Sequence, residues 1–407
     1  MTQENHKAIV VGGGPAGLMA ADAMSAGGLA VTIYDRMPTL GRKFLLAGRG
    51  GLNLTHGEDS AAFMRRYDQA EWLEPHIRAF APDALRDFSA SLGEPTFVGS
   101  SGRVFPKSFK SSPFLRAWLR KLAARGVGFA PRHCFAGFED GAALFDTGAG
   151  RVPVRAAATV LALGGASWPR LGADGGWVAA LPGVAIRPLA PANCGFTLGW
   201  SEGFAARFAG EPLKTVRVSH GGQSLRGDVM ITERGIEGGA VYALSRGLRE
   251  ALMRDGAAHL EIDLRPDIAL EKLARKLERP RAGQSTSTFL RKAAGLSPLA
   301  IALLRESAGG PLPERPFPLA ERIKEMKLAL TGLAGMERAI STAGGVMRDA
   351  CDANLMLKSL PGVFVAGEML DWEAPTGGYL LQACFATGAA AGRAAVEWAG
   401  KAGGGVP

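Results

Sequence analysis

The sequence has few cysteines and few histidines. Its 407 residues contain four cysteines and six histidines. No two cysteines form a Cys-x-x-Cys pair, and the histidines lack the spacing of metal ligands. This composition argues against a disulfide-stapled fold and predicts that no metal is bound. We expect a reducing compartment, the cytoplasm.

The sequence also lacks a long apolar run. No segment reaches the roughly 20 apolar residues that span a bilayer. The stretch from Ala8 to Val31 is apolar, but a glycine turn and Asp22 interrupt it, and no convincing cleavage site follows. We therefore expect neither a signal peptide nor a membrane partner. The hydrophobic content of 47% predicts two or three packed domains.

Acidic residues are missing from one stretch of a basic chain. The formal net charge is +9, and no carboxylate occurs between Glu94 and Glu139. The stretch carries eight basic residues: Arg103, Lys107, Lys110, Arg116, Arg120, Lys121, Arg125 and Arg132. Segment 113–125 has the pattern of a helix that buries Leu115, Trp118, Leu119 and Leu122 and turns Arg116, Arg120 and Lys121 outward. Such a face is commonly only solvated, but it can also contact RNA phosphates.

The N-terminal segment has the pattern of a dinucleotide-binding turn. An apolar strand, residues 8–11, runs into Gly12, Gly14 and Gly17, which match G-x-G-x-x-G. The first glycine allows a sharp turn, the second leaves room for a pyrophosphate, and the third lets helix and strand pack closely. The phosphates would lie on amides of the following helix, which begins with Pro15 and Ala16.

A second strand, residues 29–35, follows this helix and ends in Asp35, eighteen residues after Gly17. A carboxylate at this place accepts hydrogen bonds from an adenosine ribose that carries no phosphate. Glycine is abundant, at 56 residues, so the motif alone would be weak. The strand, the helix and the acid in the right order make an ordinary tight turn a poor alternative.

The rest of the chain predicts a discontinuous nucleotide domain. Residues 128–154 have the pattern of a small β-meander, and residues 158–163 form an apolar strand before Gly164 and Gly165. We place the first part of the nucleotide domain at 1–187 and its second part at 344–407. A β-rich domain, 188–343, would separate them and carry a helical insertion at about 267–325.

Several motifs together resemble one flavoprotein family. A strand at 362–366 ends in Gly367 and Glu368, as in flavoproteins with two dinucleotide-binding domains. Four further segments narrow the match, namely 41–56 (GRKFLLAGRGGLNLTH), 163–169 (LGGASWP), 231–240 (ITERGIEGGA) and 376–382 (TGGYLLQ). The chain thus resembles the BaiN/RdsA, or YhiN-like, NAD(P)/FAD-dependent oxidoreductases over nearly its whole length.

The resemblance implies an α/β fold, in which a Rossmann-like FAD/NAD(P)-binding domain is interrupted by a β-barrel-like domain with a helical insertion. It implies FAD as the cofactor and NAD(P)H as a possible reductant. No second G-x-G-x-x-G unit is visible, so NAD(P)H would share the substrate cleft by turns. The expected FAD-binding residues are Gly12, Gly14, Pro15, Ala16, Gly17, Asp35, Arg36, Gly41, Arg42, Lys43, Gly51, Leu52, Asn53, Gly164, Gly165, Gly367, Glu368, Gly377, Gly378, Tyr379 and Leu380.

The expected chemistry lies near the start of a long helix at Tyr379. Its N-terminus would face the isoalloxazine and favour the anionic reduced flavin by about 1 to 2 kcal/mol. Tyr379 and His56 are the candidate catalytic acid or base groups. Many members of the family have Gly-Arg-Cys-Asn where this chain has Gly51-Leu52-Asn53, so a cysteine proton donor is missing there.

The function stays open between several readings. The leading one is hydride transfer from NAD(P)H through FAD to an activated C=C of a small molecule. Family members are also ribosomal RNA dihydrouridine synthases or flavin oxidases of a small amine, so structured RNA is an alternative partner. A non-enzymatic, flavin-carrying RNA-binding or regulatory protein is a further alternative. The sequence does not decide the substrate, the choice of NADH or NADPH, or the oligomeric state.

Overall fold

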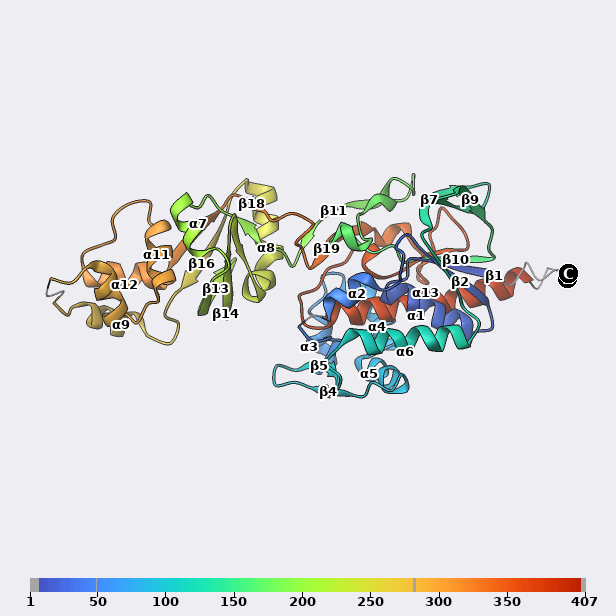
Figure 1. The fold of residues 1–407 in the computed structure, drawn as a ribbon, viewed down its shortest axis with the longest axis horizontal. Helices are drawn as coiled ribbons and strands as arrows, with labels where there is room; N and C mark the ends of the chain where they lie inside the picture. Colours follow the sequence, from blue (N-terminus) through green and yellow to red (C-terminus); the bar gives the residue numbers. More distant parts are fainter. Residues whose placement is uncertain (1–6, 49, 281–282, 404–407) are drawn as a thin grey trace. The chain divides into compact units, whose positions relative to one another are not determined.

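The computed structural model describes residues 7–48, 50–280 and 283–403, which form two compact units (Figure 1). Unit 1 comprises the described residues of Met1–Ala190 and Ser341–Pro407, and unit 2 is Pro191–Ile340. The chain therefore leaves unit 1 and later returns to it.

A five-stranded parallel sheet forms the centre of unit 1, in the order β20-β10-β1-β2-β6. Its strands are β1 (Lys7–Val11), β2 (Ala30–Asp35), β6 (Gly128–Pro131), β10 (Ala158–Leu161) and β20 (Val363–Val365). Val11 pairs with Leu161, and Leu161 pairs with Val365. Since neighbouring parallel strands end at one edge, the glycine turns after β1, β10 and β20 meet there. The predicted Rossmann-like fold is confirmed.

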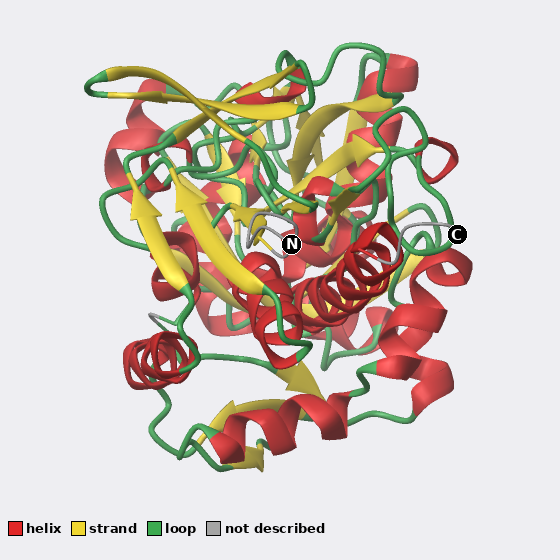
Figure 2. Ribbon diagram, turned by 90° about the vertical axis from the view of Figure 1, so that its right-hand side faces the viewer, coloured by secondary structure: helices red, strands yellow, loops and turns green. Residues whose placement is uncertain are grey.

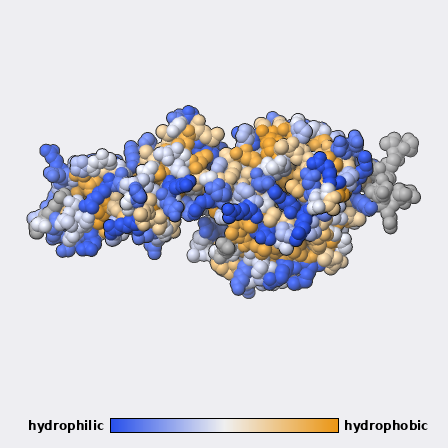
Figure 3. All heavy atoms as spheres, turned by 45° about the horizontal axis from the view of Figure 1, so that its top comes forward, coloured by the Kyte–Doolittle hydropathy of each residue, from blue (hydrophilic) through white to orange (hydrophobic). Residues whose placement is uncertain are grey.

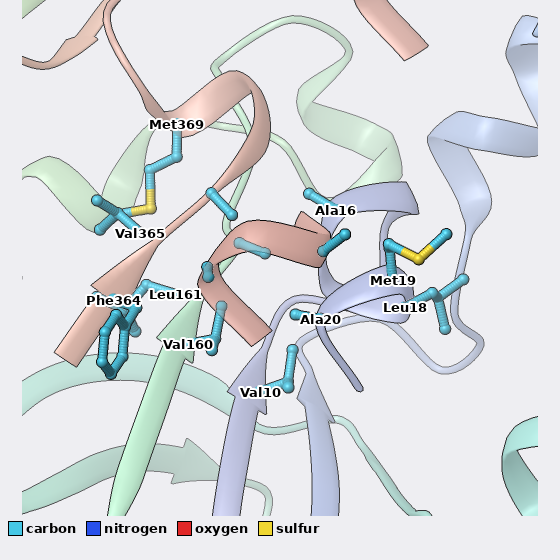
Figure 4. Close-up of a cluster of buried hydrophobic side chains, with 14 of the residues drawn as sticks. Val10, Ala16, Leu18, Met19, Ala20, Val160, Leu161, Phe364, Val365 and Met369 are labelled. Carbon is cyan, nitrogen blue, oxygen red and sulfur yellow. The ribbon is translucent and has the colours of Figure 1, made fainter. Parts of the chain in front are cut away.

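Two helices rich in small residues pack on this sheet, α1 (Pro15–Ala26) and α13 (Tyr379–Gly403). A Cβ added to Gly388 of α13 would lie 2.3 Å from the carbonyl oxygen of Ala16 in α1. Because Gly388 has no side chain, the backbones of α1 and α13 approach each other closely at this point. Figure 4 shows the apolar core beneath them, where Val10, Val160 and Phe364 are buried.

Helices and two small antiparallel sheets complete unit 1, and Figure 2 distinguishes helices, in red, from strands, in yellow. The helices are α2 (Arg42–Ala47), α3 (Ser60–Met64), α4 (Ala70–Ala79), α5 (Pro82–Ser91) and α6 (Ser111–Ala124), and 3₁₀ turns lie at 169–171, 176–178, 348–350 and 367–369. The small sheets are β3 (Thr55–His56) with β5 (Arg103–Pro106) and β4 (Thr96–Val98), and β7 (Cys134–Glu139) with β8 (Ala142–Thr147) and β9 (Gly150–Val154).

Two local expectations are wrong. The segment 128–131 belongs to the parallel sheet as β6, because it pairs with β2, and only β7 to β9 form the meander. Lys121 does not point away from the protein. Its ammonium lies 2.9 Å from a carboxylate oxygen of Asp22 in α1 and over the ring of Phe88, so it helps to join α6 to α1. Arg116 and Arg120 are exposed, as expected.

An antiparallel sheet forms the core of unit 2, in the order β17-β16-β13-β14-β15-β12-β18. Its strands are β12 (Phe196–Thr197), β13 (Pro212–His220), β14 (Gln223–Thr232), β15 (Gly235–Glu237), β16 (Ala258–Asp263), β17 (Met326–Leu330) and β18 (Gly332–Leu333). The two edge strands, β17 and β18, are separated in the chain by Thr331 alone. The sheet must therefore curl until its edges meet, which is the predicted barrel-like form.

Two helices pack on this sheet, α7 (Glu202–Phe208) and α8 (Gly239–Asp255). The helices between β16 and β17 pack mainly on one another: α9 (Leu270–Leu277), α10 (Thr286–Ala293), α11 (Pro298–Glu306) and α12 (Pro316–Lys324). Both units hold a separate apolar core. Figure 3 shows hydrophilic side chains across the visible surface of each unit, with apolar ones between them. Two further strands, β11 (Ile186–Ala192) and β19 (Ser341–Val346), pair where the chain passes between the units.

Candidate functional site

The glycines before and within the first turn of α1 differ in what surrounds them. Gly12 has φ +104°, and a Cβ there would lie 2.2 Å from the carbonyl oxygen of Ala162. A Cβ on Gly17 would lie 1.9 Å from the carbonyl oxygen of Gly12. A Cβ on Gly14 would meet no protein atom within 4 Å, and its φ of −82° suits any residue. Gly14 thus borders open space.

Backbone amides lie at the same place. The first hydrogen bond within α1 runs from the Leu18 N–H to the Gly14 carbonyl, at 2.8 Å. The N–H groups of Ala16 and Gly17 therefore precede the helical ladder and point along the helix axis, and Pro15 has no N–H to satisfy. This is the arrangement that binds phosphate at a helix N-terminus.

Asp35 at the end of β2 closes the turn from the other side. One carboxylate oxygen accepts the N–H of Gly13 and the other that of Met37, both at 2.7 Å. Burial raises the pKa of Asp35, against the lowering effect of these two amides and of Arg36. Each oxygen retains a lone pair for a further donor. Arg36 forms an ion pair with Asp174, so its guanidinium is already engaged within the protein.

The acid predicted after β20 lies in a polar cluster. One oxygen of Glu368 accepts the Thr342 N–H at 3.0 Å, and the other accepts Lys43 Nζ at 2.6 Å. Lys43 Nζ also lies 2.6 Å from Ser167 Oγ. Neither Thr342 nor Ser167 is among the expected FAD-binding residues, although Ser167 lies in the 163–169 motif.

Glycines line this cluster. A Cβ on Gly165 would lie 2.2 Å from the Thr342 hydroxyl, whereas one on Gly164 would lie 4.0 Å from Glu368. Gly367 has φ +79° and packs against Ala16 of α1. The structure therefore brings together the turns after β1, β10 and β20, as the strand order requires.

The loop from Gly41 to Asn53 reaches the same edge of the sheet. The Gly41 N–H donates to the Gly13 carbonyl at 2.9 Å, and Arg42 follows at the start of α2. Leu52 is fully buried, and Gly51 lies against the ring of Phe109. Among the described residues, Arg42 Nε, Asn53 Oδ1 and Thr55 Oγ1 are buried atoms without a hydrogen-bond partner.

The turn before α13 packs onto the strand β3. Gly377 and Gly378 have φ of +138° and +99°, and a Cβ on Gly378 would lie 2.5 Å from backbone atoms of Thr55. The Gln382 N–H makes the first helical bond, to the Gly378 carbonyl, at 3.0 Å. The amides of Tyr379 and Leu380 precede that bond. Tyr379 is buried and Leu380 is half-buried.

The two candidate catalytic residues lie side by side. The rings of His56 and Tyr379 stack with centroids 5.4 Å apart. The Tyr379 hydroxyl donates to Glu58 at 2.6 Å, and Arg66 holds the same carboxylate with two hydrogen bonds of 3.1 and 2.8 Å. Glu58 and Arg66 were missed in the sequence because neither belongs to a recognised motif.

The cysteine nearest this region is Cys384, one turn into α13. Burial raises the pKa of its thiol to about 12, with a further raising effect of Glu368. Cys384 is therefore a neutral thiol near pH 7 and does not supply a thiolate nucleophile.

FAD fits the residues of this edge. The open space at Gly14 and the amides of α1 suit a pyrophosphate, and Asp35 can accept from a ribose. Arg42 Nε offers a buried donor and Asn53 Oδ1 a buried acceptor for a polar ring.

In the described part of the chain, no group of three or more His, Cys, Asp or Glu residues could hold a metal ion. The helices of that part include none that is long and apolar enough to cross a membrane.

Comparisons with known proteins place the chain in a family. The family model described as "HI0933-like protein Rossmann domain" matches residues 6–394, so the chain belongs to the HI0933-like family. The 3-dehydro-bile acid delta(4,6)-reductase of Clostridium scindens is 27% identical, over 95% of this chain and 98% of the relative. The ribosomal RNA dihydrouridine synthase of Haemophilus influenzae is 24% identical, over 92% and 94%.

A solved structure shares the fold. The 3-ketosteroid delta1-dehydrogenase of Sterolibacterium denitrificans aligns with a TM-score of 0.52 and 12% identity, over 96% of this chain and 100% of that one.

Proposed function

We propose that this HI0933-like protein is an FAD-dependent oxidoreductase that passes hydride from NAD(P)H, through the flavin, to an activated C=C of a small molecule. The observation that carries this is the open space at Gly14, directly before the free amides of α1. Backbone atoms occupy the Cβ positions of Gly12 and Gly17, and the Leu40 side chain occupies that of Gly13. Within this turn, the Cβ position of Gly14 is the one that leaves room for a ligand.

The proposed binding mode uses the edge where β1, β10 and β20 end. The amides of Ala16 and Gly17 bind the pyrophosphate, and Asp35 accepts from the adenosine ribose. Glu368, held by Lys43 and Thr342, binds the ribityl or pyrophosphate region. Asn53, Arg42 and the first amides of α13 bind the polar side of the isoalloxazine, which supplies hydride transfer when bound.

The protein's own contribution is electrostatic and steric. The N-terminus of α13 is the positive end of a helix dipole, and it stabilises negative charge beside it by about 1 to 2 kcal/mol in a buried setting. The helix is held in place because Gly378 packs on Thr55 and because the Tyr67 hydroxyl donates to the Tyr379 carbonyl at 2.8 Å. A C=C substrate is supported by the name of the Clostridium scindens relative.

A second candidate is RNA reduction, with a uracil C=C as the substrate. It is favoured by the exposed arginines of α6 and by the name of the Haemophilus influenzae relative. Phosphate contacts would make RNA affinity fall steeply with salt. RNA retention without turnover would favour the non-enzymatic alternative.

The test begins with the cofactor. Purified protein should be yellow and should release FAD, and no FMN, when it is denatured. Under anaerobic conditions NADH or NADPH should bleach the flavin absorbance, and an α,β-unsaturated ketone should restore it. Protein that is colourless and does not take up FAD would contradict the proposal. If only ribosomal RNA restores the absorbance of the reduced flavin, the second candidate, RNA reduction, is the function.

A further inference from the structure

A chain of hydrogen bonds links the buried start of α13 with solvent. It begins at the phenol of Tyr379, which donates to Glu58 Oε1 at 2.6 Å. It continues to Arg66, which donates to both carboxylate oxygens of Glu58. The side chain of Tyr379 is buried, that of Glu58 is 14% exposed, and that of Arg66 is 48% exposed. Two steps therefore lead from the core to water.

His56 supports this chain without being a link in it. Its Nδ1 accepts the Glu58 N–H at 3.2 Å, and its Nε2 lies 3.0 Å from the Ser101 carbonyl, which can only accept. These two partners fix the neutral Nε2–H tautomer. Both nitrogens are engaged with backbone, so the ring stacks on Tyr379 and positions it. The proposed role of His56 thereby shifts from acid or base to positioning residue.

The charges around the chain fix where the proton rests. The Arg66 hydrogen bonds lower the pKa of the Glu58 carboxyl, against the raising effect of burial, and the Tyr379 hydroxyl also lowers it. Burial raises the pKa of Tyr379, and the hydrogen bond to Glu58 raises it further, against the opposing effect of Arg66. Tyr67 also packs on Tyr379, and burial raises the pKa of Tyr67 well above the usual value. At rest the proton lies on Tyr379, and Glu58 is a carboxylate.

We propose that Tyr379 and Glu58 form a proton relay, with Arg66 setting its resting state. The relay rests on the proposed function, because reduction of a C=C needs one proton for each hydride. When hydride forms a C–H bond at one carbon, the π electron pair moves to the other. The Tyr379 O–H bond breaks as a C–H bond forms at that carbon. Glu58, after taking a proton from water, passes it to the Tyr379 oxygen.

The first test measures the coupling without any substrate. The ultraviolet absorbance of phenolate is titrated in wild-type protein, Glu58→Gln, Tyr379→Phe and the double variant. Only the range in which circular dichroism shows folded protein is used. Subtracting the Tyr379→Phe curve isolates Tyr379. Its ionisation should move to lower pH in Glu58→Gln, because the charge and the hydrogen bond that raise its pKa are lost. An unchanged position would overturn the relay.

The second test measures proton delivery during turnover. The FAD-loaded protein is assayed with NADPH and a panel of enones from 2-cyclohexen-1-one to steroid enones. General acid catalysis contributes about 100-fold or more. Glu58→Gln and Tyr379→Phe should each lose about that factor in kcat, and the double variant should lose no more than either. Losses that multiply would show independent roles and overturn the relay.

Arg66 gives a signature that a structural role would not give. Without its charge the pKa of Glu58 should rise, so that the carboxyl is protonated over a wider pH range. Because the protonated carboxyl reloads Tyr379, the fall of kcat with rising pH should occur at higher pH in Arg66→Gln than in the wild type. Arg65→Gln is the matched control, since Arg65 is exposed on the same turn. Equal profiles in the two variants would count against the relay.

The two proposals fail in different ways. Wild-type protein that binds FAD but reduces no enone would end the proposed function and leave the relay without a substrate. If Glu58→Gln reduces an enone with the kcat of the wild type, the relay is overturned and the proposed function stands.

Discussion

The two helix N-termini of the candidate site use glycine for opposite purposes. Before α1, Gly14 borders open space, and a Cβ there would meet no protein atom within 4 Å. Before α13, Gly378 touches the backbone of Thr55, and a Cβ would lie 2.5 Å from it. In both turns a glycine directly precedes the helix. The first glycine leaves room for a ligand, and the second leaves room for another part of the chain.

The largest expected effect comes from filling the packed turn. Gly378→Ala would place a Cβ against Thr55 at a backbone φ of +99°, so both contact and conformation are unfavourable. We expect a loss of about 2 to 4 kcal/mol in the free energy of unfolding. Chemical denaturation measures it. Gly14→Ala should change stability by less than about 0.5 kcal/mol. If Gly378→Ala and Gly14→Ala lose the same unfolding free energy, the two glycines do not differ in the space around them.

Asp35 tests whether the open turn binds an adenosine ribose. Removing a charged acceptor costs about 1.5 to 3 kcal/mol, so Asp35→Ala should weaken FAD binding roughly ten- to a hundred-fold. The measurement is titration of apoprotein with FAD. Asp35→Asn is the intermediate variant, because its one amide oxygen can accept from only one of the Gly13 and Met37 amides, which bind separate oxygens of Asp35. An unchanged FAD affinity in Asp35→Ala would show that the ribose is bound elsewhere.

The hydrogen bonds that Glu58 accepts from Tyr379 and Arg66, beside the turn before α13, can be tested through pH. The pKa of Glu58 is lowered in the folded state, so its ionised form stabilises the fold above the unfolded pKa near 4.5. That contribution should be lost as the pH falls through the folded pKa. The difference in unfolding free energy between wild type and Glu58→Gln should therefore shrink on acidification below that value. If this difference in unfolding free energy does not change with pH, the ionised Glu58 does not stabilise the fold.

The smallest expected effect concerns the surface of α6. If Arg116 and Arg120 contact RNA phosphates, changing both to Gln should reduce the log-log salt slope of RNA binding by about 0.7 to 0.9 for each contact. FAD content and stability should not change. Lys121→Gln is a useful contrast, because that ammonium pairs with Asp22 and its loss should lower stability. A salt slope unaltered in the double variant would exclude this face as the RNA site.

The sequence predicts most of the unit 1 fold because its local motifs are each compatible with one backbone structure. Gly12, Gly17 and the strands around them specify one turn, since no other residue fits the backbone contacts. The β6 strand was misassigned because a four-residue strand looks the same in a meander and in a parallel sheet. Its partner, β2, lies almost 100 residues away in the sequence.

The polar groups of the candidate site are less visible in the sequence. Thr342, Glu58 and Arg66 belong to none of the motifs, and Ser167 lies within the 163–169 motif without marking itself as a polar contact. Ser167, Thr342 and Glu58 each bond a residue distant in the chain. Lys121 was assigned to solvent because helical periodicity places it near the edge of the polar face. Only the position of Asp22 on a neighbouring helix turns it inward.

The central claim is that the space at Gly14 belongs to the FAD pyrophosphate, and Gly14→Val tests it most directly. With both proteins free of FAD, circular dichroism and the unfolding midpoint should match those of the wild type, because the new side chain meets open space at an ordinary φ. FAD titration of the apoprotein should show no measurable binding, because the side chain occupies the place of the phosphates. A folded variant that binds FAD with the affinity of the wild type would contradict the account.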